Sequence, residues 1–209
     1  MKKAVTLCVL TCLLVLTSAP RFSLAAKPTV LVVGDSISAA YGMSLDDGWV
    51  ALLQERINKL GLSYQVVNAS ISGDVSSSGA SRIAKLLNKF QPEWTLIELG
   101  GNDGLRGMPL KHIKGNLESM IKDGEAAGTQ VVLVGMEIFP NYGPKYTAAF
   151  KDIYHDLAKT HKLPFVPFIL KGVGGLPHMN QADGVHPTKA AQRLLLDNVW
   201  TTLGPLLSQ

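Results

Sequence analysis

The stretch Thr29-Val30-Leu31-Val32-Val33-Gly34-Asp35-Ser36 runs from five apolar or β-branched residues directly into a polar turn. Hydrophobicity that is continuous rather than alternating predicts a strand covered on both faces. Four more apolar runs follow at residues 64–67, 94–99, 130–136 and 165–168. The sequence therefore predicts a central parallel sheet of five strands.

Amphipathic stretches with helical spacing separate these runs. Strands that alternate with helices favour a parallel sheet with helices on both faces, which is an α/β fold. No internal repeat, low-complexity tract or linker is evident, so we expect residues 27–209 to form one domain. The predicted helices span residues 48–60, 79–90, 109–127, 146–161 and 188–207.

The first 26 residues have the pattern of a secretory signal peptide. A short basic start is followed by the uncharged stretch Ala4 to Leu16 and by the small residues at positions 25 and 26. The apolar stretch is too short for a stable membrane span. We expect cleavage after Ala25 or Ala26, with export to the periplasm or the medium.

Removing this segment changes the apparent chemistry of the chain. Lys2, Lys3 and Arg21 lie in it, so 17 of the 20 basic residues remain, against 16 acidic ones. This balance gives no case for a nucleic-acid partner. Cys8 and Cys12 are also lost, which leaves no thiol, disulfide or cysteine metal site. Without an interaction tail or coiled coil, a monomer is the default expectation.

Polar residues follow several of the predicted strands. Ser36 comes after the first strand, Gly73 after the second and Asn102 after the third, and Asp183 and His186 come after the fifth. Parallel strands present their carboxyl ends at one edge of a sheet, where α/β proteins bind ligands. Gly-Asp-Ser alone is also a good tight turn. Convergence of all these segments is the stronger indication of a site.

The residue types at this edge suit ester chemistry. A serine hydroxyl is a poor nucleophile until a base removes its proton, and His186 can do this for Ser36. Asp183, three residues earlier, can hold the ring in the correct tautomer. Attack on an ester produces an oxyanion, which backbone N–H groups of Ser36 and Gly73 and the Asn102 amide can bind. A turn glycine and a capping asparagine remain alternatives for the last two residues.

These motifs resemble, in order, the four sequence blocks of the SGNH (GDSL-type) hydrolase family. Two longer stretches, Asn68–Asp74 and Glu98–Gly107, are similar to the exported bacterial branch known as arylesterase, acyl-CoA thioesterase I and lysophospholipase. The four blocks are Gly34-Asp35-Ser36, Gly73, Gly101-Asn102-Asp103 and Asp183-Gly184-Val185-His186.

The resemblance implies a three-layer, flavodoxin-like fold and a serine ester hydrolase that needs no cofactor or metal. It implies Ser36 as nucleophile, His186 as base and Asp183 as its orienting partner, with Gly73 and Asn102 as oxyanion donors beside the Ser36 amide. The implied substrates are small aryl esters, acyl thioesters and lysophospholipids. Apolar residues near the strand ends can form an acyl-binding wall or simply pack under loops: Leu105, Met108, Ile138, Phe139 and Tyr142.

Three other functions are consistent with parts of the pattern. A carbohydrate or peptidoglycan acetylesterase would use the same three catalytic residues with a short acyl pocket. A non-catalytic flavin- or phosphate-binding module fits the fold, but its glycine-rich signatures are absent and Asp183 and His186 would have no role. A metal-dependent hydrolase would need a third ligand beside these two residues, and no His-Glu-x-x-His-type cluster supplies it. A serine ester hydrolase remains the leading hypothesis.

Overall fold

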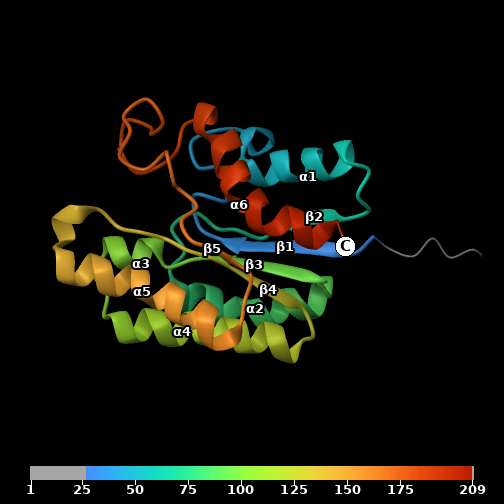
Figure 1. Ribbon diagram of the computed structural model, residues 1–209, viewed down its shortest axis with the longest axis horizontal. Coiled ribbons are helices and arrows are strands. Elements are labelled where there is room, and N and C mark those ends of the chain that lie inside the picture. The colour runs from blue at the N-terminus through green and yellow to red at the C-terminus, as the bar shows by residue number, and fades with distance from the viewer. Residues whose placement is uncertain (1–26, 209) are drawn as a thin grey trace, which may run out of the picture.

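The computed structural model describes residues 27–208, which are built around one parallel sheet (Figure 1). The strands lie in the order β2-β1-β3-β4-β5, which is the flavodoxin-like order. Every residue of β1 and β3 is buried, so these central strands are covered on both faces as their continuous hydrophobicity predicts. The strands are β1 (Thr29–Gly34), β2 (Gln65–Asn68), β3 (Trp94–Glu98), β4 (Gln130–Val134) and β5 (Phe165–Val166).

Helices cover both faces of this sheet and complete the three layers predicted from the sequence. Figure 1 shows α1 (Trp49–Lys59) and α6 (Gln192–Leu207) on one side of the strands. On the other side lie α2 (Ser76–Phe90), α4 (Leu110–Ala126) and α5 (Pro144–His161). The short elements are η1 (Leu45–Asp47), α3 (Gly101–Leu105), η2 (Pro140–Tyr142) and η3 (Lys189–Ala191).

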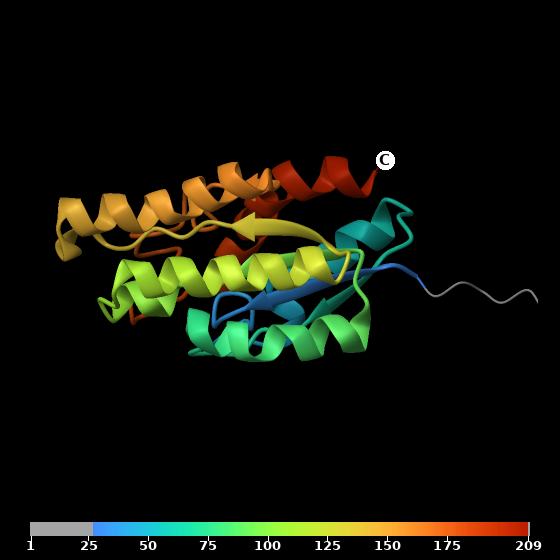
Figure 2. The same ribbon diagram turned by 90° about the horizontal axis from the view of Figure 1, so that it is seen from below.

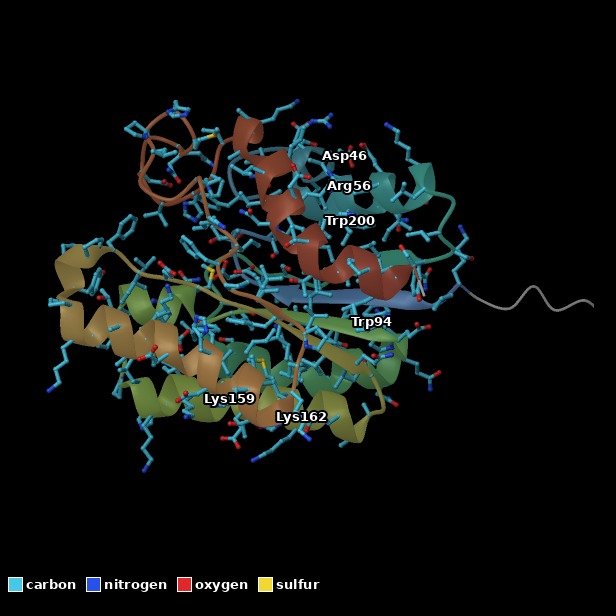
Figure 3. All side chains as sticks on the ribbon, in the orientation of Figure 1. Asp46, Arg56, Trp94, Lys159, Lys162 and Trp200 are labelled. Atoms are coloured by element: carbon cyan, nitrogen blue, oxygen red, sulfur yellow. The ribbon has the colours of Figure 1, made fainter. Side chains whose placement is uncertain are left out.

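The layer of α1 and α6 is joined by polar contacts as well as by its apolar core. The Arg56 guanidinium lies 5.4 Å from the ring centroid of Trp200, and Figure 3 shows the two side chains between these helices. Arg56 Nη2 also donates to Asp197 Oδ1 at 2.6 Å. In the interior, Gln192 Oε1 accepts the backbone N–H of Trp49 at 3.0 Å and thereby caps the start of α1.

Some of the predicted helices differ from the structure. Helix α2 begins at Ser76 rather than at residue 79, because the Asp103 carboxylate accepts both the N–H and the hydroxyl of Ser76. This cap comes from a distant part of the chain, and no local signal announces it. Helix α3, which carries Asn102, was not predicted, since five residues are too few for a helical period. The last α-helix begins at Gln192, after a 3₁₀ turn, and not at residue 188.

The polar segments gather at one edge of the sheet. Figure 2 shows β1 (blue) and β4 (yellow) with their arrowheads at the same end of the molecule, and the loops that follow the strands lie there. Parallel strands deliver their carboxyl ends to this edge, as expected for a ligand site in an α/β sheet. Among residues 27–208, no helix has the length and hydropathy that a membrane span requires.

Candidate active site

Ser36 lies in a tight turn that starts where β1 ends. Its chain neighbour Asp35 accepts the N–H of Ala39 at 2.9 Å through its carbonyl group, so the turn resembles one turn of helix. A β-carbon on Gly34 would lie 2.6 Å from Glu98 Oε2 and 2.7 Å from Ser38 Oγ. Glycine therefore leaves room for the Glu98 carboxyl and the Ser38 hydroxyl directly beneath the serine, which is itself only 7% exposed.

A loop after β5 brings His186 and Asp183 to this serine. Ser36 Oγ and His186 Nε2 are 2.9 Å apart, and His186 Nδ1 lies 2.7 Å from Asp183 Oδ2. Asp183 Oδ1 accepts the N–H groups of Val185 and His186 at 2.9 and 3.0 Å. Chiefly the backbone N–H of His186, then its ring, lowers the pKa of Asp183 to about 2. The three residues thus form one continuous hydrogen-bonded chain that ends in a carboxylate ionised near neutral pH.

The exposed ring of Tyr41 covers His186, a contact that sequence reasoning missed. The ring centroids are 4.2 Å apart with an interplanar angle of 34°. Gln181 links the two segments, because its side-chain amide donates to the Tyr41 carbonyl at 2.8 Å and its backbone N–H donates to the His186 carbonyl at 2.7 Å. Tyr41 lies outside every motif in the sequence, and no local pattern indicates a contact 145 positions away.

Three groups at this edge of the sheet can donate hydrogen bonds: the backbone N–H groups of Ser36 and Gly73 and the side-chain amide of Asn102. Gly73, in the loop after β2, has a φ of +84°, which favours glycine. Asn102 lies in the first turn of α3 and donates through Nδ2 to the Asp74 carbonyl at 2.8 Å and to Asp35 Oδ2 at 3.2 Å. In the described part of the chain, the backbone N–H groups of Ser36 and Gly73 make no hydrogen bond. Unused donors of this kind can receive a negatively charged oxygen.

Two carboxyl groups are buried under the serine turn. Glu98 is fully buried, and its Oε2 accepts the Ser38 hydroxyl at 2.6 Å and the Asp35 N–H at 3.4 Å. Burial, followed by the nearby Asp35 carboxyl, raises the pKa of Glu98 well above its usual range. Burial also raises the pKa of Asp35 to about 7, although the Ile37 N–H donates to Oδ1 and opposes the rise. The sequence placed Glu98 inside a motif without assigning it this role.

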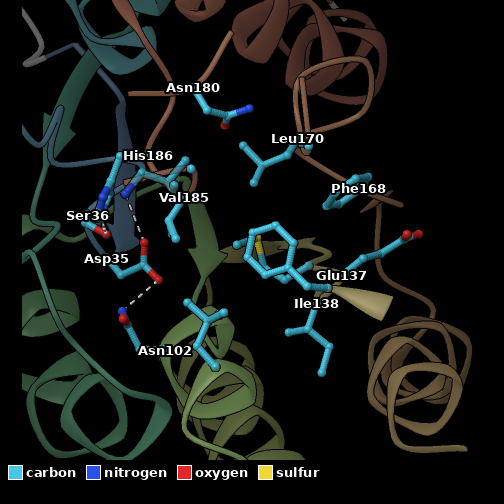
Figure 4. Close-up of a pocket in the computed structure, with 18 of the residues that line it drawn as sticks. Asp35, Ser36, Asn102, Glu137, Ile138, Phe168, Leu170, Asn180, Val185 and His186 are labelled. Atoms are coloured by element: carbon cyan, nitrogen blue, oxygen red, sulfur yellow. Dashed lines mark hydrogen bonds between the residues drawn. The ribbon is translucent and has the colours of Figure 1, made fainter. Parts of the chain in front are cut away.

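An apolar cavity of about 560 Å³ opens beside Ser36 and His186 (Figure 4). Of the five residues proposed from the sequence as an acyl wall, Leu105, Ile138 and Phe139 line it. Met108 and Tyr142 do not, and the structure gives both a packing role instead. Tyr142 donates its hydroxyl to the Leu105 carbonyl, while Met108 packs against the core and its carbonyl accepts the Tyr146 hydroxyl. The sequence missed Met136, Phe168, Leu170 and Val185 in this wall.

The contacts of His186 with both Ser36 and Asp183 suit acyl transfer by a serine. His186 and Asp183 contact each other, so their facing atoms are used in the hydrogen bond at 2.7 Å. Within residues 27–208 no group of three or more His, Cys, Asp or Glu side chains is placed to hold a metal ion.

The buried carboxyl of Glu98 predicts a pH-dependent stability difference. An acid whose pKa rises on folding binds its proton more tightly in the folded state, so the free energy of unfolding falls as the pH rises above about 4.5. Glu98→Gln keeps the shape and removes this titration. The Tm of Glu98→Gln minus the Tm of the unchanged protein should therefore be more positive at pH 8 than at pH 5. Differential scanning fluorimetry at both pH values measures this change.

The exposed Glu55 supplies the matched control for that comparison. Glu55→Gln should shift the Tm equally at pH 5 and pH 8. A Glu98→Gln shift in Tm that is equal at both pH values, or less favourable at pH 8, would contradict a raised pKa of Glu98 in the folded protein.

Comparison with known proteins agrees with this geometry. Residues 32–194 match the model of the GDSL-like lipase/acylhydrolase family. Esterase TesA of Pseudomonas aeruginosa is 54% identical over 183 residues, which are 88% of this chain and 91% of that protein. Thioesterase 1/protease 1/lysophospholipase L1 of Escherichia coli is 41% identical over 187 residues, covering 90% and 88% of the two chains.

A solved structure is similar to this chain in fold as well as in sequence. The psychrotrophic esterase EstA from a Pseudoalteromonas species, in a structure inhibited by monoethylphosphonate, superposes with a TM-score of 0.82 at 36% identity. The match covers 87% of this chain and 99% of that one. On the family match, the identities and the shared architecture, the chain belongs to the GDSL-like lipase/acylhydrolase family.

Proposed function

We propose that this protein is a serine hydrolase of carboxylic esters that works through an acyl-enzyme on Ser36. The observation that carries the proposal is the continuous chain from Ser36 Oγ to His186 Nε2 at 2.9 Å and from His186 Nδ1 to Asp183 Oδ2 at 2.7 Å. Membership of a lipase/acylhydrolase family supports hydrolysis of acyl esters as the reaction class. Geometry and family therefore point to the same chemistry.

The first half of the reaction forms the acyl-enzyme. Ser36 Oγ attacks the ester carbonyl carbon while His186 Nε2 takes the hydroxyl proton. The carbonyl electron pair moves onto oxygen and then returns as the bond to the leaving group breaks. His186 gives its proton to the departing alcohol or thiol, and Asp183 stabilises the imidazolium between these events. The acyl group is left on Ser36 Oγ.

The second half repeats these steps with water. His186 takes a proton from the attacking water, the new oxyanion forms, and Ser36 Oγ leaves with the proton as the carboxylic acid is released. The developing oxyanion is bound in both halves by the N–H groups of Ser36 and Gly73 and by the Asn102 amide. Support for this assignment comes from the two unused backbone donors and from the position of Asn102 beside the serine turn.

The apolar cavity supports a substrate with an acyl chain. Its wall includes Leu105, Ile138, Phe139, Phe168 and Leu170 and opens directly beside the nucleophile. Relatives are named esterase, arylesterase and thioesterase 1/protease 1/lysophospholipase L1. We therefore propose aryl esters, acyl thioesters and lysophospholipids as substrates. A short acetyl group would leave most of this apolar surface without a partner, which disfavours the acetylesterase hypothesis.

Export is part of the same proposal. The sequence pattern of residues 1–26, which lie outside the described part of the chain, supports a cleaved signal peptide and a protein that acts in the periplasm or the medium. A monomer remains the default expectation for its assembly. Expression of the full chain in a bacterial host should yield active protein outside the cytoplasm, with a mature N-terminus near Ala26 or Lys27. Active, uncleaved protein found only in the cytoplasm would contradict export.

Removal of the nucleophile tests the mechanism. Ser36→Ala should lower kcat for p-nitrophenyl esters by about 10⁴–10⁶ while leaving the fold intact, because the covalent step is lost. The exposed Ser44, whose side chain makes no capping hydrogen bond, provides the control, and Ser44→Ala should keep the full rate. Normal turnover by folded Ser36→Ala would overturn the assignment.

A series of p-nitrophenyl esters from C2 to C16 tests the acyl site. Each buried methylene contributes about 0.8 kcal/mol, so kcat/KM should rise about fourfold per carbon until the cavity is filled. Ile138→Ala should reduce this rise for long chains and leave C2 hydrolysis nearly unchanged. A profile that peaks at C2 and falls with length would favour the acetylesterase instead.

A further inference from the structure

Both N–H groups of the Asn102 amide are already in use inside the protein. Nδ2 donates to the Asp74 carbonyl at 2.8 Å and to Asp35 Oδ2 at 3.2 Å, and Figure 4 draws the second contact below Ser36. A side-chain amide has two hydrogens on its nitrogen, so neither is left over. If Asn102 binds the oxyanion, one of these two contacts has to yield as the oxyanion forms.

These two acceptors also decide which way the amide faces. The oxygen and nitrogen of an asparagine amide have nearly the same shape, so only hydrogen bonding selects between the two orientations. A flipped Asn102 would turn its carbonyl oxygen toward the Asp74 carbonyl and the Asp35 carboxyl. Oxygen facing oxygen is repulsive, and two part-buried hydrogen bonds would be lost. The two acceptors therefore hold the nitrogen toward Asp35, the chain neighbour of the nucleophile Ser36.

The Asp74 contact is the more firmly held of the two. Asp74 is paired through its carboxylate with Arg82 Nε at 2.9 Å, and both side chains are mostly buried. Arg82 Nη1 also donates to the Ala69 carbonyl at 2.6 Å, which fixes the loop after β2. The bond from Asn102 to the Asp74 carbonyl is shorter by 0.4 Å than the bond to Asp35. The longer hydrogen bond to Asp35 is therefore the one that can break when the oxyanion forms.

Asp35 is fixed well enough to orient another group. Its side chain is buried, Oδ1 accepts the Ile37 N–H at 3.0 Å, and its own backbone N–H points to Glu98 Oε2. A β-carbon on Gly101 would lie only 3.4 Å from Oδ2, so the carboxyl sits close against the start of α3. Asp35 is also the chain neighbour of Ser36, and its place relative to the nucleophile is set by the same turn.

We propose that Asp35 is a positioning residue for the hydrolytic reaction: its carboxyl group holds the Asn102 amide with Nδ2 toward Ser36 and releases one N–H to the oxyanion in the transition state. This inference rests on the proposed function. The oxyanion exists in the transition state and not in the bound ester, so the contribution of Asp35 falls on kcat rather than on KM.

A double-mutant cycle on p-nitrophenyl ester hydrolysis tests this inference. Asn102→Ala should lower kcat by about 10²–10³, the usual cost of one oxyanion donor. Asp35→Ala should lower it by about 10–100, with KM changed less than about threefold. Because Asp35 acts through Asn102, the double variant should be no slower than Asn102→Ala within about twofold.

Two further variants make the cycle specific. Asp35→Asn keeps one acceptor oxygen and should lose less activity than Asp35→Ala, and it replaces that variant in the cycle if Asp35→Ala does not fold. Ser38→Ala removes a hydrogen bond to Glu98 from the same buried turn without touching Asn102. In the Ser38 and Asn102 double variant, the fold-losses in kcat of the two single variants should therefore multiply.

The outcomes separate the inference from the proposed function. Losses that multiply in the Asp35 and Asn102 double variant, or an Asp35→Ala protein with unchanged kcat, would overturn the positioning role while leaving the serine mechanism in place. Turnover by Ser36→Ala at the normal rate would instead overturn the proposed function itself. Thermal melts of all variants show that the compared proteins are folded.

Discussion

The buried carboxyl of Glu98 joins the end of β3 to the turn that carries Ser36. In the sheet register Gly34 of β1 pairs with Glu98 of β3, and the same carboxyl oxygen accepts the Ser38 hydroxyl and the Asp35 N–H. These groups lie on either side of Ser36 in the chain. Since a buried donor left without its acceptor costs about 1–3 kcal/mol, the turn is strongly restricted to this conformation. The position of the nucleophile thus follows from the pairing of the two central strands.

Polar side chains also connect α2, α3 and the loop after β2 to this turn. Asp103 of α3 caps the start of α2 through Ser76, and Asn102 next to it contacts Asp35. Arg82 of α2 holds Asp74, whose carbonyl accepts the Asn102 amide. Apart from the pair of Arg82 and Asp74, these links join segments that are distant in the sequence and adjacent at the carboxyl edge of the sheet. A substitution in α2 can therefore shift the oxyanion side of the site without touching substrate.

The sequence predicted what depends on local pattern and missed what depends on distant partners. Continuous apolar runs located the five strands, the polar turn after the first strand located Ser36, and the three-residue spacing from Asp183 located His186. The start of α2 was misplaced because its cap comes from Asp103. The contact of Tyr41 with His186 and the links through Glu98 were missed because no periodicity encodes which loop meets which. Ile138 lines the cavity and Met108 does not, but both are apolar loop residues, so the sequence could not tell them apart.

The electrostatics of the site explain why buried acids can lie beside an oxyanion. A reaction that creates negative charge next to Ser36 is opposed by any carboxylate nearby, and such opposition is strong where water is excluded. Burial raises the pKa values of Asp35 and Glu98, so these groups become protonated at a higher pH than exposed acids do. Asp74 is paired with Arg82, and Asp183 faces the ring that becomes positive during the reaction. Asp183, whose pKa is lowered, faces the imidazolium and stabilises the transition state, while the raised pKa values of Asp35 and Glu98 reduce the negative charge beneath the nucleophile.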